Sequence, residues 1–584
     1  GSVGGPLASI QKAMERAASG DTIMLKPGTY KTAQMVYPFS IFDNSTGQQS
    51  AFKKLDSLVI RSQKGASSTI IDANNQGRHF MITASDIFTV DSTFKFMGLT
   101  FRGGRAEDSG GSIMIESYST SNTGFISSNV VARPKFENCR FVDNRSGENS
   151  NSFGFGGAIM ALNATPIFEN CVFDSNYSNQ GGAINYQGNI DRDLHTSYIR
   201  NSSFNGNVAF DDNGGGAAGG AVAIMNGQDF SITNSTFNGN VATSSIGGSQ
   251  GGAIYLSYQW DPMHDAVLEI ANSRFTKNVS QGQPSVQSQG GAIFVGSPFV
   301  MTGSVVDSNY SSQAGGGIAV DMQYINKNGS TYEGYVELIN NTIVNNSVNP
   351  ADPTIPGFGG AIIDYNIDQH DKLWFNNIIW GNQSNNQSNE PSSGVWLQTF
   401  NGQPLSSQGT DWNGYNNIQD VAEIKAFFDY DFGDNTSSID PNFKSAGSFQ
   451  LSDSSPMIGA GAAVFHGDVT PPLIDIDGNR RPSPSGSNPD LGAYENALAK
   501  SPYPDQVRDL VAEELTKSVR LRWTANTASN IKHYNVYYSL NKTVNRNELT
   551  KAISTADTMH LVTNLENGAE YHFVVSAVDS SNFE

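Results

Sequence analysis

A repeating order of apolar and polar positions runs through the middle of the chain. Each copy reads apolar residue, any residue, Asn, two residues, Phe or Ile, two residues, Asn, and the clearest copies are residues 136–144 and 168–176. Seven copies lie between residues 138 and 382, and a weaker one has Gly303 in place of the first Asn. Their central residues are Phe141, Phe173, Phe204, Phe237, Phe275, Val306, Ile343 and Ile379. The period of about 31 to 38 residues predicts a solenoid, in which each repeat buries its apolar face only against its neighbours.

Within each repeat, the pattern predicts short strands joined by bends. The asparagines that flank each Phe fall at the bends, where coils stacked about 4.8 Å apart allow equivalent amides to form a hydrogen-bonded ladder. We expect Asn170 and Asn234 to belong to this ladder and to serve stability rather than binding. A Gly-Gly-small-Ile/Val phrase, such as residues 181–184, precedes each copy. Its doubled glycines predict a turn with positive φ.

The two cysteines of the chain, Cys139 and Cys171, occupy equivalent positions one repeat apart. Cys139 lies two residues before Phe141, so both side chains point to the same strand face, the interior. In-register parallel neighbours aim their Cβ atoms alike, which strains a disulfide. We therefore expect free, buried thiols on neighbouring coils. Two cysteines are also too few for a disulfide framework or a four-ligand zinc site.

Both ends of the solenoid have their own patterns. Residues 7–20 predict a short helix with Ser9 as N-cap and Gly20 as stop, because the apolar residues between them recur at i, i+3, i+4 and i+7. A helix laid across the first coil would cover the open sheet edge there. From Asp411 onward the repeat degrades, and residues 411–497 are interpreted as the C-terminal closing segment.

The last part of the chain, residues 498–584, lacks the repeat and has a different pattern of apolar and polar residues. Three runs between residues 519 and 577 alternate with period two, as half-buried strands do. Leu565 precedes Tyr571 by six residues, which fits the tyrosine corner of a β-sandwich. The segment resembles a fibronectin type III module, and the chain stops just before the last strand of such a module. We expect the native protein to continue beyond both ends.

The repeat resembles the right-handed parallel β-helix of the pectate-lyase-like superfamily. Its Gly-Gly-Ala-Ile and Phe-x-x-Asn phrases are similar to those of chlamydial polymorphic outer-membrane proteins. The phrases at 440–443, 475–481 and 490–495 look like the closing segment of secreted β-helix proteins with a choice-of-anchor Q type domain. These resemblances imply export to the cell surface or beyond. They do not imply an activity, because the same scaffold carries lyases, hydrolases and inert adhesins.

The expected fold class is therefore all-β. It consists of a right-handed parallel β-helix solenoid with an N-terminal helical cap over residues 1–410, the closing segment over 411–497 and a fibronectin type III-like β-sandwich over 498–584.

Charge and composition exclude several partners. The chain has 584 residues, a net charge of −20 and 60 glycines. Nucleic acids and anionic membranes demand basic patches, so this charge argues against both. No run of apolar residues approaches the length of a membrane span.

Two kinds of carbohydrate chemistry are open to this scaffold. A polysaccharide lyase needs a Lys, Arg or His base and a cation such as Ca²⁺, yet basic residues between 106 and 440 are sparse and do not recur at the same repeat position. A glycoside hydrolase uses clustered aspartates on adjacent coils. The candidate acids are Asp211, Asp212, Asp261, Asp265 and Asp364, and the candidate sugar-stacking residues are Trp260 and Trp374. The alternative is that these acids solvate long loops and the tryptophans cover them.

A candidate metal site lies in the closing segment. Asp475, Asp477 and Asn479 follow the Asp-x-Asp-Gly opening of calcium loops. The full ligand set of such a loop does not follow, so an Asp–Gly turn is the alternative. We expect no required cofactor, with Ca²⁺ as the one metal that this motif would admit.

The expected function is that of an extracellular or cell-surface structural or adhesive β-helix, a fragment of a larger secreted bacterial protein that forms part of a fibre or surface assembly. The expected partners are neighbouring chains or domains beyond residue 584, with a polysaccharide as a further candidate. The alternatives are a polysaccharide lyase or glycoside hydrolase with its site in the long loops, and a non-catalytic carbohydrate-binding protein.

Overall fold

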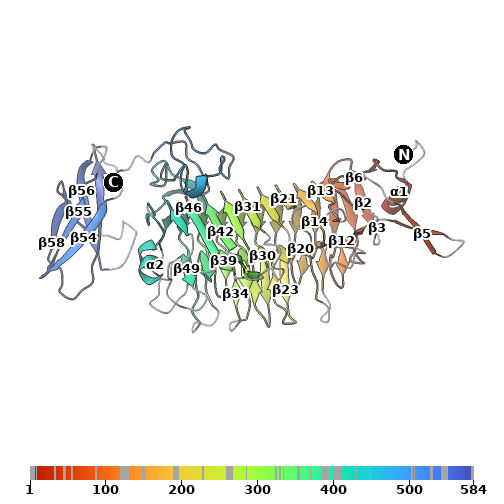
Figure 1. Ribbon diagram of the computed structural model, residues 1–584, viewed down its shortest axis with the longest axis horizontal. Helices are drawn as coiled ribbons and strands as arrows, with labels where there is room; N and C mark the ends of the chain where they lie inside the picture. The colour runs from red at the N-terminus through yellow and green to blue at the C-terminus, as the bar shows by residue number, and fades with distance from the viewer. Residues whose placement is uncertain are drawn as a thin grey trace.

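The computed structural model describes residues 7, 9–31, 35–37, 39–43, 48–53, 57–85, 89–118, 131–147, 153–188, 196–225, 229–257, 267–283, 286–322, 325–327, 330–332, 334–350, 355–367, 370–384, 394–398, 411–428, 431–433, 435–445, 447–500, 504, 507–526, 531–540 and 550–580. These residues form a long parallel β-helix followed by an antiparallel sandwich (Figure 1). The all-β fold class expected from the repeats is confirmed.

Three long parallel sheets run along the solenoid, each with one short strand per coil. Sheet A comprises β1 (Thr22–Leu25), β6 (Val59–Ser62), β9 (Lys95–Met97), β13 (Lys135–Glu137), β17 (Ile167–Glu169), β21 (Ser197–Arg200), β26 (Phe230–Thr233), β31 (Leu268–Ala271), β36 (Phe299–Thr302), β42 (Gly334–Ile339), β46 (His370–Phe375) and β50 (Trp412–Gly414). Sheet B comprises β2 (Gly28–Lys31), β7 (Thr69–Asp72), β10 (Thr100–Arg102), β14 (Arg140–Val142), β18 (Val172–Asp174), β22 (Ser203–Asn205), β27 (Thr236–Asn238), β32 (Arg274–Thr276), β37 (Val305–Asp307), β43 (Thr342–Val344), β47 (Ile378–Trp380) and β51 (Asn417–Ile418). Sheet C comprises β3 (Met35–Tyr37), β8 (Phe80–Ser85), β12 (Ile113–Tyr118), β16 (Ile159–Leu162), β20 (Ile184–Gln187), β25 (Val222–Met225), β30 (Ile254–Leu256), β35 (Ile293–Val295), β39 (Ile318–Asp321), β45 (Ile362–Tyr365) and β49 (Val395–Gln398).

Smaller sheets and hairpins complete the coils. A short parallel sheet comprises β11 (Arg105–Ala106), β15 (Arg145–Ser146), β19 (Tyr177–Ser178), β23 (Val208–Asp211), β28 (Val241–Ser244), β33 (Val279–Gln281), β38 (Tyr310–Ser311), β44 (Ser347–Val348) and β48 (Gln383–Ser384). A three-stranded sheet comprises β24 (Ala217–Ala218), β29 (Ser249–Gln250) and β34 (Ser288–Gln289). Two antiparallel hairpins, β4 (Phe39–Asp43) with β5 (Gln48–Lys53) and β40 (Ile325–Lys327) with β41 (Ser330–Tyr332), are inserted into the coils.

The interior of the solenoid is filled by stacked aromatic rings. The central phenylalanines of sheet B lie in register on successive strands, so Phe173, Phe204, Phe237 and Phe275 stack with ring centroids 4.6 to 4.7 Å apart and nearly parallel planes. A parallel sheet repeats every residue at the strand spacing, which brings identical rings face to face. From Val306 onward, branched aliphatic residues continue the column.

A buried asparagine ladder follows the bend between sheet B and the short sheet. Its members are Asn144, Asn176, Asn207, Asn240, Asn278, Asn309, Asn346 and Asn382, and each Nδ2 donates to Oδ1 of the next at 2.9 Å. The same Nδ2 atoms also donate to main-chain carbonyls of the preceding coil, as from Asn240 to Phe204 at 3.0 Å. The ladder therefore satisfies polar groups that the solenoid buries at this bend.

The prediction that Asn170 and Asn234 belong to the ladder is wrong. Both side chains are exposed, and their backbones have φ angles of 52° and 50°. They occupy the bend between sheets A and B, where the left-handed conformation suits Asn better than most residues. The ladder at this bend is formed one position later, by Ser202, Ser235, Ser273, Ser304, Asn341, Asn377 and Asn416.

The doubled glycines are required by close approach between coils. Gly181 has φ of 64°, and a Cβ atom there would lie 2.2 Å from the Ile184 carbonyl oxygen. At Gly182 a Cβ atom would lie 2.1 Å from the Gly220 carbonyl oxygen of the next coil. Any side chain at these two positions would push the backbone apart, which confirms the turn with positive φ.

Helices cover both ends of the solenoid core. At the N-terminus, α1 (Ile10–Arg16) begins after Ser9, whose side chain accepts a hydrogen bond from the Lys12 N–H at 3.1 Å. Its buried residues Ile10 and Met14 join the solenoid core, so the predicted helical cap is confirmed. The helix is shorter than predicted, because it ends at Arg16 with Ala17 as C-cap and does not reach Gly20. At the other end α2 (Val421–Phe428) contributes Ile424, which is fully buried in the same core.

The segment after α2 does not simply close the end; it folds back along the outside of the last coils. Its hairpin of β52 (Phe443–Ser445) and β53 (Ser448–Leu451) leads into irregular chain that Figure 1 shows on one side of the rod. Phe449 and Tyr494 pack outside sheet B against Val305. Tyr494 Oη also accepts a hydrogen bond from Arg274 Nη1 at 2.5 Å. We call residues 440–497 the strap.

The two cysteines are free and buried, as predicted. The adjacent residues Arg140 and Val172 pair in register, so Cys139 and Cys171 lie on neighbouring coils. Burial raises the pKa of the Cys139 thiol to about 12, which keeps it protonated and unreactive.

The C-terminal sandwich consists of two antiparallel sheets. One contains β54 (Arg508–Leu515), β55 (Ser518–Thr524) and β58 (Met559–Thr563), and the other contains β57 (Thr550–Thr555), β56 (Ile531–Ser539) and β59 (His572–Asp579). Trp523 and Tyr534 meet edge to face in the core between them, with ring centroids 5.5 Å apart. Tyr571 Oη accepts a hydrogen bond from the Glu566 N–H at 3.2 Å, the expected tyrosine corner.

Candidate functional site

The candidate acids of the short sheet have different surroundings. Asp211, at the end of β23, is fully buried. Its carboxylate accepts hydrogen bonds from the N–H groups of Asn213, Gly214 and Gly216 at 2.8 to 3.1 Å. Asp211 therefore closes the loop that follows it and is not available to a substrate. Asp212 is exposed.

Two other candidates, Asp364 and Trp374, lie inside the solenoid. The side chains of Asp364 and of His370 are completely buried, and His370 Nε2 lies 3.2 Å from Asp364 Oδ2. Lys372 is also buried inside, where Nζ donates to the His370 carbonyl at 2.8 Å and lies 3.3 Å from Asp411 Oδ1. Trp374 follows on the same strand face and is 1% exposed. The interpretations of Trp374 as a sugar-stacking residue and of Asp364 as a loop acid are wrong, because both side chains belong to the core.

The remaining loop candidates, Asp261, Asp265 and Trp260, lie outside the described residues. Asp211 belongs to the short sheet, whereas Asp364 belongs to sheet C several coils further on. The described candidates therefore do not form the close pair of accessible carboxylates that a glycosidase uses.

The proposed calcium motif forms a closed turn. Asp475 Oδ1 accepts hydrogen bonds from the N–H groups of Asp477 and Asn479 at 3.0 and 2.7 Å. Its Oδ2 accepts from the Glu495 N–H at 2.9 Å. Asp477 instead pairs with Arg274 of the solenoid, with 2.9 Å between Oδ1 and Nη2. Across the described part of the chain, no three His, Cys, Asp or Glu residues are grouped so that they could hold a metal ion.

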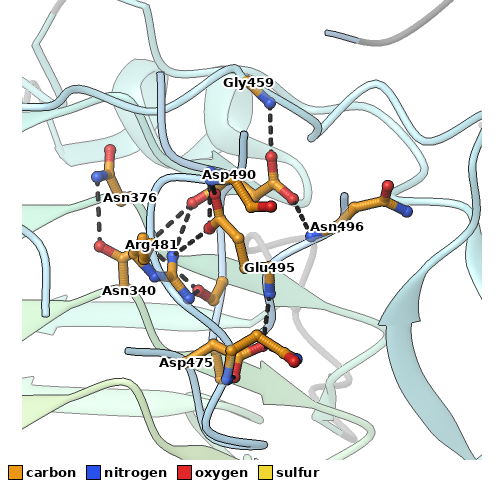
Figure 2. Close-up of polar contacts among 12 residues, drawn as sticks. Asn340, Asn376, Gly459, Asp475, Arg481, Asp490, Glu495 and Asn496 are labelled. Atoms are coloured by element: carbon orange, nitrogen blue, oxygen red, sulfur yellow. Dashed lines mark hydrogen bonds and ion pairs between the residues drawn. The ribbon is translucent and has the colours of Figure 1, made fainter. Parts of the chain in front are cut away.

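A polar cluster that the sequence did not predict lies in the strap. It surrounds Arg481 in the strap (Figure 2). The guanidinium donates to the carbonyls of Asp490 and Gly492 at 3.0 Å each, and Nη1 lies 3.5 Å from Glu495 Oε2 with both side chains fully buried. Asp490 accepts hydrogen bonds from the N–H groups of Gly459 and Asn496 at 2.7 and 2.6 Å. The buried Arg481 side chain thus joins its own turn to the main chain at Asp490 and Gly492 and to the carboxylate of Glu495.

The same cluster joins the strap to the solenoid. Asn340 Nδ2 donates to the Asp490 carbonyl at 2.9 Å. Asn376 forms a reciprocal pair with Ala462, donating to its carbonyl at 2.9 Å and accepting from its N–H at 2.8 Å. Asn340 and Asn376 have φ angles of 54° and 58° at the bend between sheets A and B. Left-handed asparagines at this bend are exposed in several earlier coils, as at Asn170 and Asn234, but here they bind the main chain of the strap.

Burial determines the electrostatics of this cluster. It raises the pKa of Asp490 to about 7, and the Glu495 charge adds to this shift while backbone N–H donors oppose it. Burial also raises the pKa of Glu495 and lowers that of Arg481. Both Asp490 carboxylate oxygens accept hydrogen bonds from N–H groups, which favour the ionised form and limit this rise of the pKa. The cluster is enclosed, so its chemistry is that of a clamp and not of a catalyst.

An outward-facing stripe on sheet C is the second feature that the sequence analysis missed. The register places Tyr255, Phe294, Ile363 and Trp396 in one row on the outside of successive strands, with Ala319 between Phe294 and Ile363. Tyr255 and Phe294 stack with centroids 5.3 Å apart. Burial, together with the Asp321 charge, raises the pKa of Tyr255 to about 12. The alternation of inward and outward residues along each strand could have suggested this stripe. In the sequence, however, the repeated phenylalanines that point inward are the more conspicuous apolar positions.

Within the residues that the structure describes, no helix is long and apolar enough to cross a membrane.

Comparisons with known proteins concern the two parts of the chain separately. A search of curated proteins found no match. Among solved structures, the PL6 family polysaccharide lyase Pedsa3628 from Pseudopedobacter saltans is similar at 15% identity and a TM-score of 0.33, over 68% of this chain and 92% of that chain. A mannuronic acid specific polysaccharide family 6 lyase from human gut microbiota is similar at 12% identity and a TM-score of 0.33, over 71% and 88%. These likenesses concern the β-helix fold alone.

The C-terminal sandwich matches a family model. Residues 505–583 match the fibronectin type III domain. The two antiparallel sheets and the tyrosine corner agree with this match. The C-terminal sandwich of this chain is therefore a fibronectin type III domain.

Proposed function

We propose that the chain is a structural and adhesive rod of the cell surface or extracellular space, in series with its fibronectin type III domain and part of a larger secreted bacterial protein. The observation that supports this proposal is the unbroken run of asparagine hydrogen bonds from Asn144 to Asn382. At about 4.8 Å per coil, a 12-stranded sheet spans about 55 Å. Such a rod needs no cofactor.

The placement of the candidate acids supports a non-catalytic role. Asp211 and Asp475 accept hydrogen bonds from the main chain of their own turns, and Asp364 is paired inside the core. A catalytic acid or base must lie within hydrogen-bond reach of the proton that it transfers in a bound substrate, which these enclosed carboxylates do not offer. These carboxylates stabilise the rod instead.

Incubation with neutral and acidic polysaccharides, with and without Ca²⁺, tests this proposal. We expect no new reducing ends and no unsaturated uronate products. In a separate experiment on intact cells, we expect added protease to cleave the native protein, because the proposal places it at the cell surface or outside the cell. Product release that disappears in Asp212→Asn or Asp265→Asn would contradict the proposal. Asp212 is chosen because its side chain is exposed, and Asp265 because it is a candidate acid of the sequence that lies outside the described residues.

The stripe on sheet C supports a second candidate function, non-catalytic carbohydrate binding. Trp396, which ends the row, and Tyr365, which lies beside Ile363 on β45, are only half-buried. Aromatic faces of this kind stack on apolar faces of sugar rings. Titration of the intact chain with oligosaccharides should quench Trp396 fluorescence, and Trp396→Ala should abolish that response without lowering the melting temperature by more than a few degrees.

A further inference from the structure

A lysine side chain enters the interior of the solenoid on β46, which Figure 1 shows near the α2 end of the rod. On the inner face of sheet A, one in-register row contains Phe230, Leu268, Phe299, Val336 and then Lys372. The four earlier members are buried apolar residues, and Lys372 is just as buried, at 1% exposure. A buried ammonium group is costly even when it is paired, whereas an apolar residue would fill this position without that penalty. Packing alone therefore does not account for a lysine in this row.

Three oxygen atoms fix the position of the Lys372 amino group. Nζ donates hydrogen bonds to the main-chain carbonyls of Ile367 and His370, the latter at 2.8 Å. The third oxygen is Oδ1 of Asp411, 3.3 Å from Nζ. The same Oδ1 accepts a hydrogen bond from the Lys372 main-chain N–H at 3.2 Å, so the carboxyl group is held against β46. The amino nitrogen and the carboxyl group are therefore kept in contact by the fold itself.

Asp411 directly precedes β50, and the register of β46 with β50 places it beside Lys372. The Lys372 side chain is completely buried, whereas 26% of the Asp411 side chain is exposed. Burial raises the pKa of Asp411, and the Lys372 charge opposes this rise. Burial thus favours the neutral carboxyl group, which an amine attacks far more readily than a carboxylate. The exposed side of Asp411 gives a small leaving group a route to solvent.

We propose that Lys372 and Asp411 form an intramolecular amide cross-link, an isopeptide bond between the last two strands of sheet A. The Lys372 ammonium first transfers one proton to the Asp411 carboxylate, which gives a neutral amine beside a neutral acid. The Nζ lone pair then forms a bond to Cγ, the bond from Cγ to one carboxyl oxygen breaks, and a second proton from Nζ leaves with that oxygen as water. One ammonium and one carboxylate become one amide and one water, and no oxidant, reductant or other reactant is consumed.

The enclosure of the two groups favours this reaction in two ways. Well-oriented intramolecular reactions reach effective concentrations of about 10⁵ to 10⁸ M, which favours closure of the bond. Conversion of an ion pair into a neutral amide also removes two charges from a site where their desolvation is costly. The bond closes a loop across 39 positions of the sequence and restricts the unfolded chain as a disulfide does. It therefore ties the terminal coil of the rod to its neighbour.

The ion pair of Lys135 with Glu169 is the matched comparison within the same sheet. Its nitrogen–oxygen distance is shorter, 2.6 Å, but 19% of the Lys135 side chain is exposed. A second carboxylate, Glu137, lies 3.5 Å from the same nitrogen. An amine that reaches water beside two carboxylates stays protonated and is not a nucleophile. We therefore expect no cross-link at Lys135, although its partner is closer.

This inference goes beyond the proposed function, and its readout does not depend on that function. After prolonged incubation of the folded full chain, its intact mass under denaturing conditions should be lower by one water molecule than the mass of the sequence. Peptide mapping should recover residues 372 and 411 in one linked peptide pair. Lys372→Arg and Asp411→Ala should each restore the full mass, whereas Lys135→Arg should keep the loss of water.

The wild-type measurement does not require any variant to fold. Lys372→Arg keeps the positive charge, so it removes the bond while retaining a cation beside Asp411. A wild-type chain with the full mass of its sequence, a loss of water that persists in Lys372→Arg, or separate peptides for residues 372 and 411 would each overturn the proposal. A linked peptide pair from Lys135 and Glu169 would overturn it as well, because burial would then not select the site.

Discussion

Removing one member of the asparagine ladder tests how the solenoid is held together. Asn240 lies in the middle of the ladder, and Asn240→Ala removes four hydrogen bonds. The side-chain Nδ2 donates to the Phe204 carbonyl at 3.0 Å and to Asn278 Oδ1 at 2.9 Å. Its Oδ1 accepts from the Asn207 N–H at 3.1 Å and from Asn207 Nδ2 at 2.9 Å.

The expected loss follows from the groups left behind. Asn207 Nδ2 still donates a hydrogen bond to the Phe173 carbonyl, and Asn278 Oδ1 still accepts a hydrogen bond from the main-chain N–H of residue 240. The Phe204 carbonyl and the Asn207 N–H lose these partners while buried. At about 1 to 3 kcal/mol for each such group, Asn240→Ala should cost about 2 to 6 kcal/mol.

Asn234→Ala is the matched comparison, six residues earlier in the same coil. Asn234 is exposed and has φ of 50°, so alanine there adds only the strain of a left-handed backbone, about 1 to 2 kcal/mol. Asn234→Gly should recover that loss, because glycine adopts this conformation freely. The same glycine substitution at Asn240 should recover nothing.

Local hydrogen exchange is the suitable assay, because a solenoid need not unfold in one step. Amides of β22, β27 and β32 should exchange faster in Asn240→Ala, and those of β6 and β9 should not. Thermal melting followed by circular dichroism gives the overall ranking. The reasoning fails if Asn240→Ala loses no more stability than Asn234→Ala.

Three further predictions concern buried groups. Cys139 and Cys171 should resist thiol reagents at pH 8 until the chain unfolds, and reductant should not change the melting temperature; a disulfide found by mass spectrometry would contradict this. Arg481→Met should cost about 3 to 5 kcal/mol and expose the strap to limited proteolysis, because the buried carboxylates of Asp490 and Glu495 lose the guanidinium beside them. Asp490 has a pKa of about 7 in the folded chain against 3.8 unfolded, so its contribution to stability is largest below about pH 4 and is lost as pH rises to about 7. Hydrogen-exchange protection of the strap, corrected for intrinsic rates, should therefore fall across that window, and an increase would refute the raised pKa of Asp490.

Several features of the fold could be predicted because a local rule determines them. A Phe column at constant spacing can only be buried by stacking coils, and Ser9 with its periodic apolar residues dictates α1. Tyr571 could be assigned for the same reason, since a tyrosine corner is a short-range hydrogen bond. The assignment of the ladder failed because both asparagines of the repeat lie at bends. Only the bend geometry separates the exposed, left-handed Asn234 from the buried Asn240.

The candidate site shows the same division. The sequence determined by itself that this chain is a stacked parallel solenoid with a capped start and a terminal sandwich, because periodicity and turn chemistry act between near neighbours. Only the tertiary structure decided that Asp364 and Trp374 face inward and that Arg481 clamps a strap onto the rod. It also decided that Lys372 and Asp411, 39 positions apart in the sequence, lie in contact at the end of sheet A. These outcomes depend on which coils touch, and contact across many coils is set by packing of the whole chain rather than by any local pattern.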